Sequence, residues 1–182
     1  MNFAEIKYCD IANGTGVRTS LFVSGCRHRC PGCFNEVAWD FMAGEPFTAD
    51  VEDRIIESLQ TPYVEGLSIL GGEPLEPENQ AALLPFLDRM AQVVPNKDVW
   101  LWTGFTWEQL VQGDGRVRTP YLAPLLKHLS TLVDGPFVEE KKDITLRFRG
   151  SSNQRIIDVA ASLASNSVVL WQDGTFFSKR TW

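Results

Sequence analysis

Apolar positions along the chain alternate between the spacing of strands and the spacing of helices. Short runs rich in β-branched and aromatic residues predict strands at 17–24, 66–70, 98–103 and 131–133. Between them, apolar residues recur every three or four positions, which predicts helices at 48–59, 77–93, 106–111 and 120–129. The first of these has Thr48 as its N-cap candidate. This order of strands and helices is typical of an α/β protein.

The remaining segments have weaker patterns. We expect a short strand or an extended arm at 4–10, an irregular or briefly helical connection at 35–44, and a charged loop at 139–143. Further extended segments are predicted at 145–148, 155–159 and 168–171. Residues 155–164 also fit a helix, but their β-branched side chains favour a strand.

The length of the chain limits how far a barrel can close. Near-continuous apolar strands, such as residues 67–70, are typical of a parallel sheet that is covered on both faces. A closed barrel of eight strand–helix units needs about 250 residues, and this chain has 182. We therefore predict an α/β fold, an open partial (β/α) barrel with mainly parallel strands. Residues 1–182 are expected to form one domain, with a candidate C-terminal extension from about residue 160.

Composition excludes several classes of function. The formal net charge of -6 argues against a nucleic-acid partner, because phosphate contacts need a basic surface. No apolar run approaches the roughly 20 residues of a membrane span, and the first residues do not have the pattern of a signal peptide. We therefore expect a cytoplasmic protein without a membrane partner. In that reducing compartment, clustered cysteines indicate metal binding or catalysis rather than disulfides.

Three of the four cysteines lie in one loop that directly follows a predicted strand. Their spacing is Cys26-x₃-Cys30-x₂-Cys33, and cysteine thiolates are the usual ligands of iron–sulfur clusters. Three thiolates can hold three irons of a [4Fe–4S] cluster and leave the fourth iron open to a substrate. Gly25 and Gly32 would let backbone N–H groups approach the cluster closely.

A structural zinc site is the alternative interpretation of the same cysteines. It would need His28 or Cys9 as its fourth ligand. Zinc sites usually have two separated pairs of ligands, and no second pair is present, so the spacing favours iron–sulfur. We interpret His28 as an exposed or supporting residue and Cys9 as a buried, inert thiol. A non-catalytic zinc-binding interaction module stays open as the rival function.

The cysteine loop, followed by Gly71-Gly72-Glu73-Pro74 after the next strand, resembles the radical S-adenosylmethionine (SAM) superfamily. More narrowly, the chain resembles the activating enzymes of anaerobic (class III) ribonucleoside-triphosphate reductases. The segments that carry this likeness are 13–18, 21–35, 102–105, 133–137 and 149–154. The resemblance covers about residues 8–153. It departs from the superfamily pattern before the third cysteine, where Gly32 stands in place of an aromatic residue.

The resemblance implies the radical SAM type of partial barrel and its chemistry. SAM would be cleaved at the [4Fe–4S] cluster to a 5′-deoxyadenosyl radical, with reduced flavodoxin or a similar protein as electron donor. The radical would then generate a glycyl radical on the large subunit of an anaerobic ribonucleoside-triphosphate reductase. An activator of a different glycyl-radical enzyme is the alternative that keeps the same chemistry.

The resemblance also assigns roles by position. Cys26, Cys30 and Cys33 are the expected catalytic cluster ligands. The methionine end of SAM is expected to lie against Gly71, Gly72 and Glu73, with the Glu73 carboxylate accepting from the ammonium group. The adenine is expected to lie against Gly32, Cys33 and Phe34. Weaker candidates for cofactor contacts are Asp134, Ser152 and Asn153, which also fit simple turn-capping roles.

Overall fold

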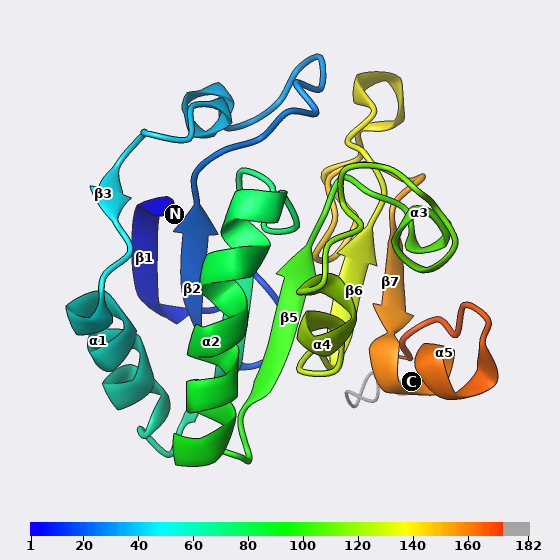
Figure 1. The fold of residues 1–182 in the computed structure, drawn as a ribbon. Coiled ribbons are helices and arrows are strands. Elements are labelled where there is room, and N and C mark those ends of the chain that lie inside the picture. The colour runs from blue at the N-terminus through cyan, green and yellow to red at the C-terminus, as the bar shows by residue number, and fades with distance from the viewer. Residues whose placement is uncertain (173–182) are drawn as a thin grey trace, which may run out of the picture.

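A computed structural model describes residues 1–172, and one seven-stranded sheet organises this part of the chain (Figure 1). The strand order is β3-β1-β2-β4-β5-β6-β7. The central strands run parallel to one another, and they are β2 (Val17–Val23), β4 (Val64–Gly71), β5 (Asp98–Trp102) and β6 (Thr131–Asp134). Antiparallel strands flank them, and these are β1 (Asn2–Asp10), β3 (Glu45–Pro46) and β7 (Arg155–Asp158). The prediction of an open, mainly parallel α/β sheet is confirmed.

Helices connect the parallel strands, and α1, α2 and α4 lie in front of the sheet in Figure 1. The α-helices are α1 (Ala49–Leu59), α2 (Pro77–Val93), α3 (Trp107–Val111), α4 (Leu122–Leu126) and α5 (Val159–Ser165). The loops after β2 and β6 contain the short 3₁₀ helices η1 (Glu36–Trp39) and η2 (Glu139–Lys141). No helix within residues 1–172 has both the length and the apolar character needed to cross a membrane.

The hydrophobic core lies between these helices and the sheet. Alternate strand residues face it, and Leu21, Leu67 and Leu101 are fully buried there. Ile55 and Leu59 of α1 cover the sheet from the helix side. Burial of this apolar surface is the dominant favourable term in folding. It also fixes the relative positions of the strand ends that carry the cysteine loop and the Gly71–Gly72 turn.

Polar and aromatic side chains fill part of the opposite face of the sheet. The fully buried guanidinium of Arg18 donates to Ser68 Oγ at 2.7 Å and to the carbonyl oxygen of Leu67 at 2.9 Å. It also forms an ion pair with Asp98 at 2.8 Å, and its central carbon lies 5.6 Å from the Trp100 ring centroid. The buried charge is therefore compensated by several partners, as a buried charge must be.

The structure differs from the predicted elements in the last third of the chain. Residues 145–148 form turns and bends, so the prediction of an extended segment there is wrong. The strand predicted at 155–159 ends at Asp158, because the Asp158 carboxylate accepts from the N–H of Ala161 and begins α5. Residues 168–171 pair with β7 through a single bridge, Ile157 to Leu170. The candidate extension continues into 173–182, which lies outside the described residues, and the single domain stays a prediction.

Candidate active site

The cysteine loop and the Gly71–Gly72 turn lie side by side at one edge of the sheet. Parallel pairing places Val23 of β2 opposite Gly71 of β4, so both segments emerge at the carboxyl ends of neighbouring strands. The N–H of Gly72 donates to the carbonyl oxygen of Val23 at 2.7 Å, and the N–H of Glu73 donates to that of Gly25 at 2.8 Å. Gly71 has a φ of +104°, and a Cβ there would lie 2.8 Å from the Val23 oxygen, so the turn requires glycine.

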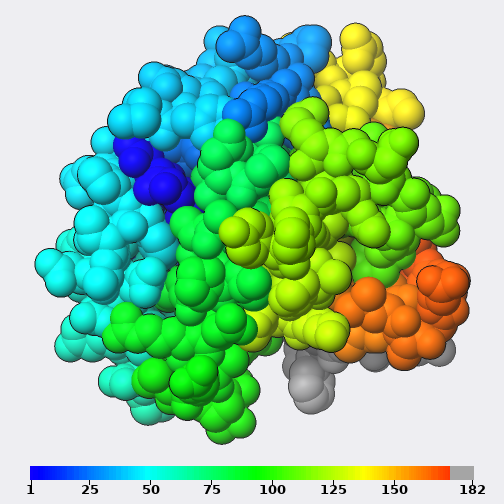
Figure 2. All heavy atoms as spheres, in the orientation of Figure 1, coloured from blue at the N-terminus to red at the C-terminus, as the bar shows by residue number. Residues whose placement is uncertain are grey.

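A cavity of about 460 Å³ opens beside these two segments. This volume is typical of sites for small molecules. The predicted site residues that line the cavity are Cys26, Cys30, Cys33, Phe34, Gly71, Gly72 and Glu73. Other lining residues come from the ends of β5 and β6 and from the segment 146–154. Gly32 is not part of the lining and lies against the Glu139 carboxylate of η2. In the space-filling view, the cysteine loop (blue) and the residues around η2 (yellow) lie next to each other at the top (Figure 2).

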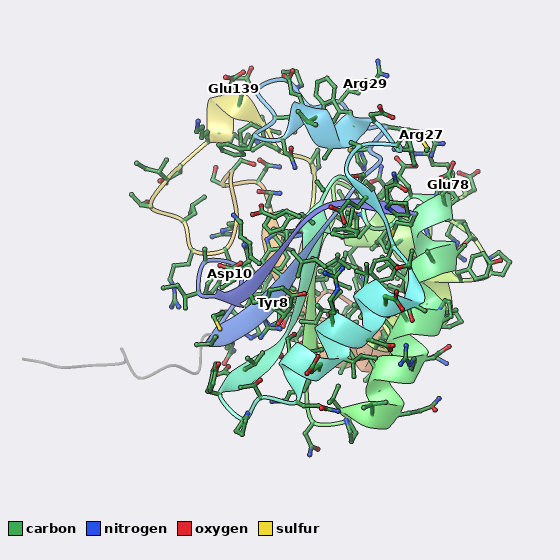
Figure 3. All side chains as sticks on the ribbon, turned by 90° about the vertical axis from the view of Figure 1, so that its left-hand side faces the viewer. Tyr8, Asp10, Arg27, Arg29, Glu78 and Glu139 are labelled. Atoms are coloured by element: carbon green, nitrogen blue, oxygen red, sulfur yellow. The ribbon has the colours of Figure 1, made fainter. Side chains whose placement is uncertain are left out.

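Arg27 ties the cysteine loop to the start of α2. The fully buried Glu76 carboxylate accepts from the Arg27 N–H at 2.9 Å, from the Arg27 guanidinium at 2.7 Å, and from Arg116 at 3.1 Å. Arg27 also pairs with Glu78, which lies beside it in Figure 3. Burial opposes the ionisation of Glu76, but the hydrogen bonds from Arg116 and Arg27 outweigh it and lower the pKa of the carboxyl group. Glu76 therefore stays charged and holds the loop in place.

The thiols of the cysteine loop are free and partly buried. Burial raises the pKa of Cys26 to about 11 and also raises the pKa of Cys30. Backbone N–H groups partly oppose this, since the Cys26 sulfur accepts from His28 and Arg29 and the Cys30 sulfur accepts from Phe137. Free thiolates at Cys26 and Cys30 are thus disfavoured until a cation binds. The Cys33 sulfur accepts from the N–H of Asn35 at an N···S distance of 3.5 Å, and N–H groups directed at sulfur are contacts that tune iron–sulfur sites.

This set of donors fits an iron–sulfur cluster. Of the two proposed fourth zinc ligands, Cys9 lies on β1 beside Tyr63, outside the cavity lining, and His28 is bonded through Nε2 to Glu73, which leaves only its Nδ1 for a metal. Cys9 is exposed, so its interpretation as a buried thiol is wrong. Within residues 1–172, no three His, Cys, Asp or Glu side chains are grouped to hold a single metal ion. A cubane cluster takes each thiolate on a different iron, so its ligands stand further apart than those of one ion.

The Glu73 side chain is 1% exposed and already fully hydrogen bonded. Its Oε1 accepts from the N–H of Leu75 and the hydroxyl of Thr103, both at 2.8 Å. Its Oε2 accepts from the N–H of Gly104 at 2.8 Å and is bonded to His28 Nε2 at 2.9 Å. A carboxylate has about four acceptor sites, so these contacts leave no capacity for the expected ammonium group. The N–H groups of Gly72 and Glu73 are also engaged, so neither is free to donate to a ligand.

The three weaker candidates do not line the cavity. Asp134 is buried at the end of β6, where its carboxylate accepts from the N–H of Trp107 at 2.7 Å and from Arg155 at 3.0 Å. These contacts do not support a ligand-binding role for Asp134. Ser152 is exposed. The amide nitrogen of Asn153 donates to the Pro136 oxygen at 2.8 Å, while its amide oxygen is buried without a partner and can still accept a hydrogen bond.

Sequence reasoning did not assign several residues that line the cavity. They are Ala12, Asn13, Phe22, Asn35, Trp39, Leu70, Trp102, Thr103, Gly104, Gly135, Phe137, Leu146, Phe148, Gly150 and Gln154. Thr103 and Gly104 directly follow β5, as the cysteine loop follows β2. Their position at the end of a parallel strand is a signal that would have identified them. The Phe137 ring lies 5.1 Å from that of Phe34, a contact that no local pattern indicates.

Comparison with known proteins points to the same chemistry. Residues 12–157 match the family described as a 4Fe-4S single cluster domain. The chain is 42% identical over 158 residues to the anaerobic ribonucleoside-triphosphate reductase-activating protein of Pasteurella multocida, covering 86% of this chain and 96% of that protein. The protein of the same name from Escherichia coli K12 is 41% identical over 156 residues, covering 85% and 96%.

A more distant relative extends this comparison to a virus. The anaerobic ribonucleoside-triphosphate reductase-activating protein of Enterobacteria phage T4 is 35% identical over 156 residues, covering 86% of this chain and 93% of that protein. All three matches span most of both chains. The family match over residues 12–157 includes the cysteine loop, the Gly71–Gly72 turn and the strands between them. The chain belongs to the family of anaerobic ribonucleoside-triphosphate reductase-activating proteins.

Proposed function

We propose that this protein activates an anaerobic ribonucleoside-triphosphate reductase by generating a glycyl radical on its large subunit. The observation that carries the proposal is the cavity shared by three free cysteines and the Gly71–Gly72 turn, in a chain similar to reductase-activating proteins. The alternative target is another glycyl-radical enzyme, and the names of the relatives favour the reductase.

Cys26, Cys30 and Cys33 are the residues that would hold the [4Fe–4S] cluster, which when bound and reduced supplies the electron that cleaves SAM to a 5′-deoxyadenosyl radical. The protein supplies position and environment. The N–H groups of Asn35 and Phe137 stabilise thiolate charge on Cys33 and Cys30. These contacts oppose the burial that disfavours free thiolates, and they therefore support thiolate ligands once a cluster is bound.

The cavity has complementary groups for the two ends of SAM. Carbonyl oxygens of the Gly71–Gly72 turn accept from the ammonium group. Phe34 and Cys33, which line the cavity, lie against the adenine. Gly32 and Asn153 lie outside the lining, so neither is assigned a contact with SAM. Apolar lining residues, which include Phe22, Leu70 and Trp102, keep water away from the reacting bond. We do not include Asp134 or Ser152 among these contacts.

The reductase reaches the cavity from the edge of the sheet where the strands end. Phe148 and Trp171 pack against Trp100 on the sheet face below the cavity, with ring centroids 5.3 and 5.2 Å from that of Trp100. This part of the open side is therefore filled by the chain itself. A glycine-bearing segment of the reductase would enter beside Phe34, which is 70% exposed at the mouth of the cavity.

The SAM reaction consumes an electron that no described residue supplies, so an external donor is needed. The family resemblance implies that this donor is a reduced flavodoxin or a similar protein. The free thiols fit a cytoplasmic location, where cysteines stay reduced. The net charge of -6 supports the absence of a nucleic-acid partner.

Electron paramagnetic resonance of the reaction mixture tests the proposal. The reconstituted protein is reduced without oxygen and mixed with SAM and the reductase, and 5′-deoxyadenosine is measured in parallel. We expect a glycyl-radical signal on the reductase together with SAM cleavage. Cleavage without that signal would move the target to another glycyl-radical enzyme. A protein that binds zinc and cleaves no SAM would establish the non-catalytic zinc-binding module instead.

A further inference from the structure

The His28 ring fills a slot built by two other strand ends. His28 lies between Cys26 and Cys30, and its side chain is 16% exposed. One edge of the ring faces Phe105, with centroids 4.5 Å apart and planes inclined by 67°. Gly104 forms another wall, where a Cβ would lie 2.7 Å from the His28 ring. The absence of a side chain at this position is therefore what admits the ring.

Glu73 connects this slot to the Gly71–Gly72 turn. The carboxylate is bonded to His28 Nε2 at 2.9 Å, and because an ionised carboxylate only accepts, Nε2 carries the proton in this contact. The same carboxylate accepts from Thr103 and Gly104 after β5. One buried group thus joins the ends of β2, β4 and β5. Hydrogen bonds to a charged group are also stronger than those between neutral groups.

The middle of the cysteine loop has few other anchors of this kind. The two ends of the loop are held by backbone bonds, since the Cys26 N–H donates to Trp39 and the Cys33 N–H donates to Cys30, both at 3.2 Å. Arg29, next to His28, is exposed and has a φ of +50°. His28 therefore adds a second side-chain anchor in the middle of the loop, beside that of Arg27 to Glu76.

We propose that His28 is a positioning residue that acts through Glu73. It sets the middle of the cysteine loop, and hence the three thiolates, relative to the Gly71–Gly72 turn that receives the methionine end of SAM. This inference rests on the proposed function. It assigns Glu73 to the alignment of the cofactor site rather than to direct contact with the ammonium group.

The test compares two substitutions of His28. His28→Leu removes the hydrogen bond and places an apolar side chain in the slot, while His28→Gln keeps an N–H donor of similar reach. His128→Leu is the matched control, because His128 is the second of the two histidines and pairs with the exposed Asp88 at 2.8 Å, away from the cavity lining. For each reconstituted protein we would measure iron content, the SAM dissociation constant, and the SAM-induced change in the resonance spectrum of the reduced cluster.

We expect His28→Leu to retain iron but to bind SAM about ten-fold more weakly, with a smaller spectral change, as is typical for residues that orient metal ligands. His28→Gln should restore both readouts to within a few-fold of wild type, and His128→Leu should change neither. Wild-type SAM affinity and spectral change in His28→Leu would overturn the inference. Loss of iron from a folded His28→Leu protein would also overturn it, because His28 would then retain the cluster itself.

A second variant keeps the inference testable if His28→Leu does not fold. Gly104→Ala removes no hydrogen-bonding side chain, but its Cβ displaces the His28 ring from the slot. We expect it to weaken SAM binding without loss of iron, and unchanged SAM binding would contradict the proposal. Wild-type protein whose cluster spectrum does not respond to SAM would refute the proposed function, which separates that failure from failure of the His28 role.

Discussion

The sheet face opposite the main core is built in two contrasting ways along the length of the strands. In the region around Arg18, side chains fill the space, and a buried guanidinium is paired with Asp98 and covered by Trp100. At the carboxyl ends, the chain instead uses glycine and backbone groups, and the Gly71–Gly72 turn and the cysteine loop leave a cavity. The difference indicates that stability and binding are separated along the same strands. Substitutions at the two regions should therefore affect different measurements.

The largest expected effect is the loss of iron and of SAM cleavage on substitution in the cysteine loop, at the carboxyl ends of the strands. Cys30→Ala removes one of the three thiolates and should abolish both the retention of iron and the cleavage of SAM. Cys9→Ala is the matched control, because Cys9 is exposed beside Tyr63 and does not line the cavity. Iron content and 5′-deoxyadenosine formation are the measurements. SAM cleavage retained by Cys30→Ala would contradict the cluster assignment.

Substitution of Arg18, in the part of the sheet face that side chains fill, is expected to lower stability without weakening SAM binding. Arg18→Met leaves Ser68 and the Leu67 carbonyl without their donor, and should lower the free energy of unfolding by about 3 kcal/mol. The control is Arg89→Met, since Arg89 pairs with Glu52 on the surface and should cost less than about 1 kcal/mol. Urea unfolding measures both. Equal losses in the two variants would show that the buried Arg18 network does not stabilise the fold.

A smaller effect, on both the free energy of unfolding and SAM binding, is expected at Gly71, which belongs to a strand and also to the proposed SAM site. Gly71→Ala places a Cβ against the Val23 carbonyl at a φ of +104°, which should cost about 1–3 kcal/mol and weaken SAM binding. Gly115→Ala is the control, because no atom lies within 4 Å of the added Cβ. We expect that control to stay within about 0.5 kcal/mol of wild type. Urea unfolding and SAM titration are the measurements, and normal SAM binding by Gly71→Ala would exclude the turn from the site.

The smallest expected effect is a pH dependence of the free energy of unfolding that arises from Glu108 and its ion pair with Arg155. Hydrogen bonds from Arg155 lower the pKa of Glu108 to about 2. Its value in the unfolded chain is about 4.3, so this contribution is complete above that pH and is lost as the pH falls toward about 2. Glu108 is half exposed, so the contribution should be below about 1 kcal/mol.

Glu108→Gln should remove this contribution and flatten the fall in unfolding free energy between about pH 4 and pH 2. Glu57→Gln, an exposed position on α1, serves as the control. Unfolding measured at several pH values would compare the slopes. A slope in Glu108→Gln as steep as that of wild type would mean that the Arg155 contact does not contribute.

The parallel centre of the fold was predictable because its strands are short apolar runs that end in turn residues. The segment at 145–148 was not, because distant contacts determine it. The indole N–H of Trp102 donates to the carbonyl oxygen of Phe148 at 2.6 Å across 46 positions, and the Phe148 ring packs on Trp100. These contacts hold Phe148 at a φ of +60°, which its local sequence does not favour.

The candidate site likewise has one part that local sequence predicts and another that depends on distant contacts. The spacing of Cys26, Cys30 and Cys33 is local, so the sequence alone indicated an iron–sulfur loop. The acceptor sites of the Glu73 carboxylate are all occupied partly because His28 and Thr103 bind it, and these residues lie 45 and 30 positions away in the sequence. A carboxylate after two glycines therefore predicts an ammonium acceptor until its distant partners are known.

The incomplete closure of the sheet has a consequence for self-association. Free strand edges can template pairing with other chains, and both edges here are partly covered by the chain's own backbone. At the outer edge of β1, β3 adds a short strand, and Phe47 donates to the carbonyl oxygen of Met1 at 3.0 Å. Beside β7, the N–H of Asp158 donates to Val169 and that of Trp171 donates to Ile156, both at 2.9 Å. A large protein substrate can therefore approach the carboxyl ends of the strands, where the cavity opens. The two outer strands are partly hydrogen bonded within the chain, which disfavours strand pairing between copies of the protein.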